Sequence, residues 1–336
     1  MSNATGPIDL RLGSPCEYTL IYISLDLPME KIYIDNSLLT FPESPIFERI
    51  IMRELISEKL KASGYLPPLP DILIALQKLM NDPDCEVEDA RRLISSDPVL
   101  SSRIITMANS ALFAGGRDLA QNIEDAIVRL GVGAVLELCY TLELPGCIKV
   151  PQTFGQTRYW RHSLAVAILS RELGSKILTD QEDLDSCYLT GLVHDIGLLA
   201  YDYLVPEQFN QFLLTTDFPA SDQSLESLEK NFFGMSHAEL GSAYLSEWWP
   251  VPAIIVEAIR DQNGSGLKMD QAPSLAQLIS TANQIANEYD IANSLETGQK
   301  ISTDESYLDA LKMTREEMDE LVDWAQVGIL AAESVL

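Results

Sequence analysis

The stretch GLVHDIGLLAY, residues 191–201, contains a His-Asp pair inside an apolar helical pattern. Apolar residues flank the pair on both sides, and together with the preceding residues the pattern predicts one helix over about 183–203. Neighbouring residues on a helix point about 100° apart, because one turn takes 3.6 residues. His194 and Asp195 can therefore flank a single metal ion that lies beside the helix.

His162 is the histidine on the preceding helical pattern. It lies in a helix predicted over about 158–178, and antiparallel packing of the two helices would bring it beside His194. Two imidazoles and one carboxylate suit a transition-metal ion with open coordination positions. Such an ion acidifies a bound water molecule for hydrolysis. His162, His194 and Asp195 are therefore candidate metal ligands.

His237 is the third histidine of the chain and the fourth candidate ligand. It lies near the start of a helix predicted from Ser236 to Pro250, between Gly234 and Gly241, and glycines let two backbones approach closely. An alternative interpretation applies to every candidate. A histidine in a helical protein is more often a satisfied core or surface side chain than a ligand, and short motifs have many false matches. Spacing alone leaves both interpretations open.

Helical patterns also fill most of the remaining chain. The predicted helices run from Ser44 to near Gly64, over 71–80, 86–95, 98–113, 122–130, 205–215, 224–233, 251–262 and 274–290, and through one or two more segments at the end of the chain. Residues 134–143 fit a helix or a strand. Residues 19–35 alternate between apolar and other side chains, which predicts two short strands. The predicted fold class is mainly α, with a strand-containing N-terminal segment.

Two breaks divide the predicted helices into subdomains. The prolines of LPPLP at 66–70 cannot continue a helix, and PQTFGQ at 151–156 marks a second boundary. The predicted division is an N-terminal segment with a linker helix, two helical subdomains, and a C-terminal loop and helix, at 1–60, 61–150, 151–290 and 291–336. The two central parts form the expected multi-helix bundle.

The charge of the chain excludes several partners. Its 336 residues contain 23 Lys and Arg but 50 Asp and Glu, which gives a formal charge of −27. Such a surface repels the phosphate backbone of nucleic acids and the anionic face of membranes. The hydrophobic fraction of 46 % is that of a globular protein rather than a disordered one. We therefore expect neither nucleic-acid nor membrane binding.

The expected location is the cytoplasm. The first residues lack a basic start followed by an apolar core, and no run of about 18 apolar residues is present. The five cysteines are odd in number and contain no CxxC pair, which is typical of reduced thiols.

Several strings together resemble the HDOD family, the HD-related output domain of bacterial signalling proteins. They run in family order from about residue 66 to 287: LPPLPDILIALQKLM, LISSDPVLSSRIITMANSALF, NIEDAIVRLGV, YWRHSLAVAILSREL, GLVHDIGLLAY, EKNFFGMSHAELGSAYLSEWWPVPAIIVEAI and LISTANQIAN. The combination is specific, although each string alone is weak. The resemblance implies an all-helical, HD-like fold related to HD-domain phosphohydrolases.

The resemblance also implies a ligand set. Enzymes of the wider superfamily hold one or two metal ions with a His, a His-Asp pair and a later Asp. His162 matches the first His, and His194 with Asp195 matches the pair. The later Asp falls at Asn283, whose neutral amide is a poorer ligand for a divalent cation. The implied metal site is therefore incomplete.

Two further positions follow from the resemblance. His237 resembles the additional His of the cyclic-dinucleotide phosphodiesterase branch. The His pair that this branch carries further along the chain is absent, and Arg260, Asp261, Gln262 and Asn263 stand there instead. We expect Arg260 near the site, where its charge would fill a space the size of a metal ion.

The expected function is a non-catalytic HDOD-type signal-transduction module that binds a signalling protein or a small-molecule ligand. No catalytic residue is assigned, and no cofactor is expected; the alternative is a divalent transition metal, namely Fe, Mn, Ni or Zn. The alternative function is a metal-dependent phosphohydrolase acting on a nucleotide or a cyclic dinucleotide. Unpaired strand edges at 19–35 invite pairing, so these residues build a homodimer, dock a partner or cover the helical body.

Overall fold

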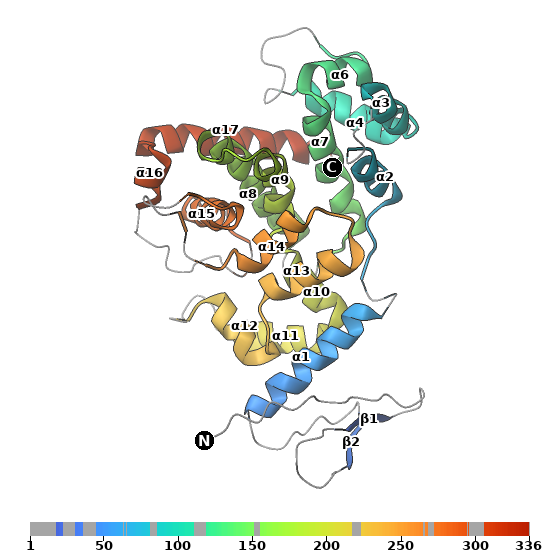
Figure 1. Cartoon of the computed structure of the whole chain (residues 1–336), viewed down its shortest axis with the longest axis vertical. Coiled ribbons are helices and arrows are strands. Elements are labelled where there is room, and N and C mark those ends of the chain that lie inside the picture. Colours follow the sequence, from blue (N-terminus) through green and yellow to red (C-terminus); the bar gives the residue numbers. More distant parts are fainter. Residues whose placement is uncertain are drawn as a thin grey trace. The chain divides into compact units, whose positions relative to one another are not determined.

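Most of the chain is placed in the computed structural model (Figure 1). It describes residues 18–22, 31–35, 45–62, 64, 66–80, 86–110, 119–150, 155–216, 223–264, 266–267, 272–293, 295 and 306–335. The chain divides into two units, Met1–Ile51 and Met52–Leu336, and each is described by itself. Helices make up the described part of the second unit, so the mainly α fold class is confirmed.

The first unit contains a two-stranded antiparallel sheet. Strand β1 (Tyr18–Tyr22) pairs with β2 (Lys31–Asp35), and Leu20 stands opposite Tyr33. Both strands lie where the alternating pattern predicts them. Helix α1 (Pro45–Lys61) then leads from this unit into the second, within the range expected from the sequence.

The second unit begins with a group of short helices that pack against one another. They are α2 (Asp71–Met80), α3 (Val87–Ser95), α4 (Pro98–Ala108), α6 (Ile123–Leu130) and α7 (Val132–Cys147). The Asp97 side chain accepts hydrogen bonds from the N–H groups of Val99 and Leu100 and so caps α4. The ambiguous segment at 134–143 is helical, and its apolar residues face the core.

Helix α4 ends at Ala108, although the sequence predicts a helix through residue 113. The Asn109 side chain explains this end: its amide donates to the carbonyl of Ala120 at 2.9 Å and accepts from the Ala120 N–H at 2.7 Å. A side chain that replaces backbone hydrogen bonds in this way favours a helix end. The predicted positions 111–113 lie outside the described residues.

The second group of helices is built around α8, which contacts α9, α15 and α17 (Figure 1). Its members are α8 (Gln156–Ile177), α9 (Gln181–Val193), α10 (Ile196–Leu204), α11 (Pro206–Thr215), α12 (Leu225–Phe233), α13 (His237–Trp248), α14 (Ala253–Asp261), α15 (Leu275–Glu288), α16 (Ser306–Leu311) and α17 (Arg315–Glu333). Among the helices that the structure describes, none is long and apolar enough to cross a membrane.

Two glycines let these helices meet backbone to backbone. A Cβ atom on Gly191 of α9 would lie 2.7 Å from the Cα of Ala167 on α8. A Cβ atom on Gly197 of α10 would lie 1.9 Å from the carbonyl oxygen of His237 on α13. Only a residue without a side chain fits at either contact. These contacts bring the end of α9 against the middle of α8, and the start of α10 against the start of α13.

The helix predicted over 183–203 is wrong as a single element, because it breaks between α9 and α10 at His194 and Asp195. The buried amide of Gln262 donates to the carbonyl oxygen of His194 at 2.7 Å and gives this carbonyl a side-chain partner at the break. The Asp195 backbone has φ −97° and ψ 11°, outside the helical region. Because of this break, His194 and Asp195 do not lie on the surface of one continuous helix. Both side chains are buried in the core.

The end of α15 delivers a second segment to the same place. The N–H of Ile291 donates to the carbonyl of Ala286, and the N–H of Asp290 donates to that of Asn287. Asp290 adopts φ 58°, the left-handed conformation that such a helix end requires. The chain therefore turns sharply, and residues 291–293 run back into the core, where all three are buried.

A buried histidine-aspartate cluster as candidate metal site

His162, His194 and Asp195 lie together in the core. The Nε2 atom of His162 is 3.6 Å from Oδ2 of Asp195, and Nε2 of His194 is 3.3 Å from Oδ1. The two imidazole centroids are 5.1 Å apart, and one ligand atom from each residue lies within 4.8 Å of the others. The antiparallel packing of α8 and α9 thus brings together residues that are distant in sequence.

Backbone carbonyls orient both imidazoles of this cluster. Nδ1 of His162 lies 2.6 Å from the carbonyl oxygen of Ile291, and Nδ1 of His194 lies 2.8 Å from that of Gly191. Because a carbonyl only accepts, each Nδ1 must carry the proton. In a neutral imidazole the Nε2 atom then carries a lone pair instead of a proton. Here the Nε2 atoms of both histidines lie near the Asp195 carboxylate.

The cluster contains acceptors without a matching donor. Nε2 of His162 and Nε2 of His194 are buried, and neither makes a hydrogen bond. A buried polar atom without a partner costs about 1–3 kcal/mol. A cation between the two nitrogens and Asp195 would satisfy all of them, and a carbonyl behind each imidazole is the usual support of a metal ligand. The residues therefore fit a divalent transition metal.

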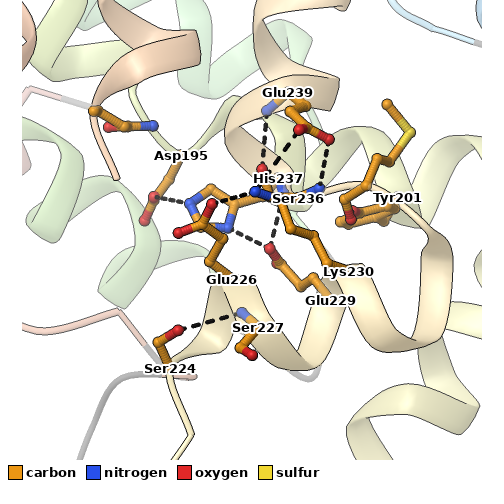
Figure 2. A network of polar contacts seen from close by, with 12 residues as sticks. Asp195, Tyr201, Ser224, Glu226, Ser227, Glu229, Lys230, Ser236, His237 and Glu239 are labelled. Carbon is orange, nitrogen blue, oxygen red and sulfur yellow. Dashed lines mark hydrogen bonds and ion pairs between the residues drawn. The ribbon is translucent and has the colours of Figure 1, made fainter. Parts of the chain in front are cut away.

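His237 approaches the same carboxylate from α13, supported by Glu229. Nδ1 and the backbone N–H of His237 both donate to Oε2 of Glu229, at 2.7 and 2.8 Å (Figure 2). Its Nε2 atom lies 3.8 Å from Oδ1 of Asp195. The carboxylate of Glu229 fixes the tautomer of His237, so a third imidazole can turn a lone pair toward the cluster.

Glu229 was not among the predicted site residues, although the sequence contains a signal for it. It is spaced four residues from Leu225 and four from Phe233, and these three form the buried face of α12. A carboxylate among apolar residues at helical spacing indicates a buried acid, which needs a partner. The partner is His237, whose identity only the tertiary structure shows.

Asn293, rather than Asn283, lies beside Asp195. The fully buried amide of Asn293 donates to Oδ2 of Asp195 at 2.6 Å. Asn283 is half-buried on α15, and its Oδ1 accepts a hydrogen bond from Asn287 at 3.2 Å. Asn293 follows the turn after α15, where no helical spacing could have indicated it.

Arg260 does not fill the space that was expected for it. Its side chain is 52 % exposed and forms an ion pair with its neighbour Asp261 at 2.9 Å. Gln262, two residues later, is the buried group, and it bonds the carbonyl of His194. The expectation for Arg260 is wrong because the end of α14 turns its charged residues to solvent, where charge is well hydrated.

Burial controls the protonation of the cluster. It lowers the pKa of His194 to about 4, although the Asp195 carboxylate opposes this shift. Burial raises the pKa of the Asp195 carboxyl, but the three histidines and Asn293 outweigh it, and the pKa lies below its ordinary value. Burial raises the pKa of Glu229 against the opposing effect of His237. A neutral His194 beside an ionised Asp195 is the combination that binds a metal ion.

The cluster is closed to solvent. His162 and His194 are fully buried, and the side chains of Asp195 and His237 are only 3 and 7 % exposed. A phosphate ester needs contact with a metal ion and its water during hydrolysis. In this packing His162 and His194 have no exposed surface, and Asp195 and His237 offer such a substrate very little.

Comparisons with known proteins agree with the fold. The sequence profile of the HDOD domain matches residues 66–265, which is more than half of the chain. An uncharacterized protein of Treponema pallidum (strain Nichols) is 27 % identical over 197 residues, which cover 58 % of this chain. The match spans 37 % of the length of that relative.

Two solved structures share the architecture. A candidate phosphohydrolase from Shewanella amazonensis SB2B has a TM-score of 0.64 at 24 % identity, covering 84 % of this chain and 98 % of its own. A candidate signal transduction protein from Marinobacter aquaeolei VT8 has a TM-score of 0.64 at 21 % identity, covering 91 and 70 %. These likenesses concern the fold, whereas the profile match assigns the family: this chain belongs to the HDOD domain family.

Proposed function

We propose that this chain is a non-catalytic, regulatory HDOD module that acts by binding a signalling protein or a small ligand. The burial of the His-Asp cluster carries this proposal. His162 and His194 have no exposed surface, and Asn293 donates to the carboxylate that a catalytic ion would share. A catalytic metal site keeps an open position for water and substrate, and this cluster is closed.

A metal ion still fits the cluster in a structural role. His162, His194 and Asp195 would hold it, and a bound divalent ion would supply positive charge and Lewis acidity at that point. The chain's own residues provide the rest: Ile291 and Gly191 orient the imidazoles, and Glu229 orients His237. An ion there would link α8 to the break between α9 and α10, much as structural metals stabilise small domains.

A hydrolysis assay tests the regulatory role. Protein purified without chelators and loaded with Mn²⁺ or Fe²⁺ is incubated with a phosphomonoester, a phosphodiester and a cyclic dinucleotide. We expect no turnover above that of His194→Ala. Turnover in the parent protein that is lost in His194→Ala but kept in Arg92→Gln, an exposed arginine on α3, would contradict the proposal.

The second candidate function is a metal-dependent phosphohydrolase. The Nε2 atoms of His162 and His194 favour this function, because both are buried, make no hydrogen bond and could bind a cation. The name of the Shewanella relative is consistent with it. The hydrolysis assay decides between the two functions, whereas metal analysis tests the cluster itself. Less than about a tenth of an equivalent of transition metal would exclude a tight site, structural or catalytic.

The remaining expectations stay predictions. They are the homodimer, the cytoplasmic location, the lack of nucleic-acid and membrane partners, and the division into parts at residues 60, 150 and 290. The dimer is tested by a truncation that starts near Glu58. An unchanged oligomeric state after removal of the strands would contradict it.

A further inference from the structure

A groove of about 690 Å³ lies outside the His-Asp cluster, with lining residues from α4, α7, α8 and α17. Its apolar lining consists mainly of Leu142, Trp160, Leu164 and Ile329, of which none is more than 6 % exposed. Volumes of this size hold small organic molecules, and such sites combine an apolar lining with a few polar groups. The lining suits a flat apolar ring.

Arginines stand at the edge of this groove. Arg103 and Arg161 line it, and a second groove of about 410 Å³ shares Arg161 and Thr157 and adds Arg158. Among the described lining residues, the carboxylates beside these arginines are those of Glu333 and Asp290, and Arg103 also lies near Glu143. In a chain with a formal charge of −27, three arginines around two adjoining grooves form an unusual cluster. It favours an anionic ligand.

The pairing of Arg161 leaves it available to an anion. Its Nε atom is 3.5 Å from Oε1 of Glu333, and that oxygen makes no hydrogen bond. The Arg161 side chain is 44 % exposed, so the contact is a weak surface ion pair. A phosphate group accepts two parallel hydrogen bonds from a guanidinium, which is a stronger contact than this pair.

The start of α8 adds further donors at the same place. The helix has 22 residues and begins at Gln156, and the preceding Gly155 has no side chain to cap it. The first N–H groups of a helix carry partial positive charge and bind phosphate. Gln156 and Thr157, which belong to this first turn, both line the larger groove.

The indole N–H of Trp160 is a second observation, independent of the charges, that bears on ligand binding. The Trp160 side chain is buried and lines the larger groove, yet its Nε1–H makes no hydrogen bond. A buried indole N–H usually has a partner. The Nε1 atom is itself covered in this packing, so a ligand acceptor would satisfy it only after entering the groove far enough to part the side chains over it.

We propose that the two adjoining grooves bind a small molecule that carries a phosphate group on a flat apolar ring system, such as a nucleoside monophosphate. Arg158, Arg161 and the start of α8 bind the phosphate, and the ring lies on the apolar lining beside Trp160. The site is separate from the His-Asp cluster. This ligand would be the small molecule of the regulatory role proposed above. The binding site itself does not depend on that role; only its biological purpose does.

The smaller groove reaches the segment that supports the His-Asp cluster. Ile291 and Ala292 line this groove. The carbonyl of Ile291 holds Nδ1 of His162, and the next residue but one, Asn293, donates to Asp195. A ligand that presses on Ile291 and Ala292 therefore acts on both hydrogen bonds, so occupancy of the groove is coupled to the orientation of His162.

A binding titration on the full chain tests the site. Guanosine monophosphate and inorganic phosphate are titrated separately, and binding is followed by calorimetry and by tryptophan fluorescence. We expect the nucleotide to bind at least about tenfold more tightly than phosphate, because only the nucleotide covers the apolar lining. Arg161→Gln should weaken nucleotide binding about tenfold or more, and Arg92→Gln, the exposed control on α3, should not.

The same samples test the coupling to the cluster. The chain has three histidines, so ¹³C-labelled imidazoles give three resonances, and His162→Gln assigns one of them. We expect the nucleotide to shift the His162 resonance in the parent protein but not in Arg158→Gln/Arg161→Gln.

Three results would overturn parts of the proposal. No binding of either probe at millimolar concentration would overturn the site. Equal affinity for both probes would overturn the assignment of the lining to a ring. Binding without a shift of His162 would overturn the coupling. None of these results bears on the hydrolysis assay, which tests the proposed function separately. Both arginine positions are exposed, so the variants should fold, which thermal melting verifies.

Discussion

The amide of Asn293 donates a 2.6 Å hydrogen bond to the carboxylate of Asp195, across 98 residues of sequence. Both side chains are buried, so the bond satisfies one oxygen of a charged group that is almost completely removed from solvent. The bond also places a neutral amide next to the carboxylate, where a second carboxylate would strengthen metal binding. We therefore expect the identity of residue 293 to affect the affinity of the cluster for a metal ion.

Asn293→Asp should make the protein more dependent on metal. In EDTA, two adjacent buried carboxylates replace a hydrogen bond, and we expect a loss of about 1–3 kcal/mol in the free energy of unfolding. Excess Mn²⁺ should restore most of this loss, because the new carboxylate would be available as a ligand for a bound ion. Urea unfolding with and without metal measures both effects.

Asn283→Asp is the control for this variant. Asn283 accepts a hydrogen bond from Asn287 through an oxygen that an aspartate also has, so little change is expected. A gain in metal dependence in Asn283→Asp, and none in Asn293→Asp, would contradict the geometry described here.

Glu229→Gln should weaken metal binding about 10- to 100-fold, the usual effect of losing the carboxylate behind a histidine ligand. The amide can still accept from His237, but it lacks the charge that makes the imidazole a better ligand. Competition with a fluorescent chelator measures the affinity. Glu226→Gln, on the same helix and paired with Lys230, is the matched control. Equal affinities in both variants would show that His237 does not reach the ion.

Gly197→Ala should destabilise the protein by about 3 kcal/mol, because its Cβ would fall 1.9 Å from the carbonyl oxygen of His237. The backbones of α10 and α13 would have to separate. Gly133→Ala is the control, since its Cβ would meet open space in α7. It should stabilise the protein by about 0.5 kcal/mol, owing to the better helix propensity of alanine. Similar urea midpoints for both variants would refute the close contact.

Cys139 and Cys187 should resist alkylation at pH 8. Burial raises the pKa of each thiol to about 12. Because only the thiolate reacts, and a raised pKa reduces it, about one thiol in ten thousand is reactive at pH 8 in the folded protein. Labelling should accelerate about tenfold with each pH unit until the pH approaches the raised pKa. Peptide mass spectrometry after iodoacetamide treatment compares native with guanidinium-unfolded protein, and equal labelling in both would disprove the burial.

The helical fold could be predicted because it depends on local patterns. Helix α2 has the predicted bounds, and Asp97 with Pro98 marks the start of α4 correctly. Two errors came from side chains that bond to distant backbone. Asn109 ends α4 by bonding Ala120, and Gln262 bonds the carbonyl of His194 at the break between α9 and α10. Neither partner can be identified from periodicity.

Local patterns in the sequence were enough to predict most of the helices, the resemblance to the family and three residues of the cluster, because apolar spacing and a His-Asp pair are local features. Long-range packing was needed to show that Glu229 and Asn293 complete the surroundings of Asp195 and that Arg260 points to solvent. The same packing buries the cluster almost completely. A buried charge forms hydrogen bonds with groups that the packing brings within about 3 Å. These groups can come from any part of the chain, so the spacing of residues in the sequence does not identify them.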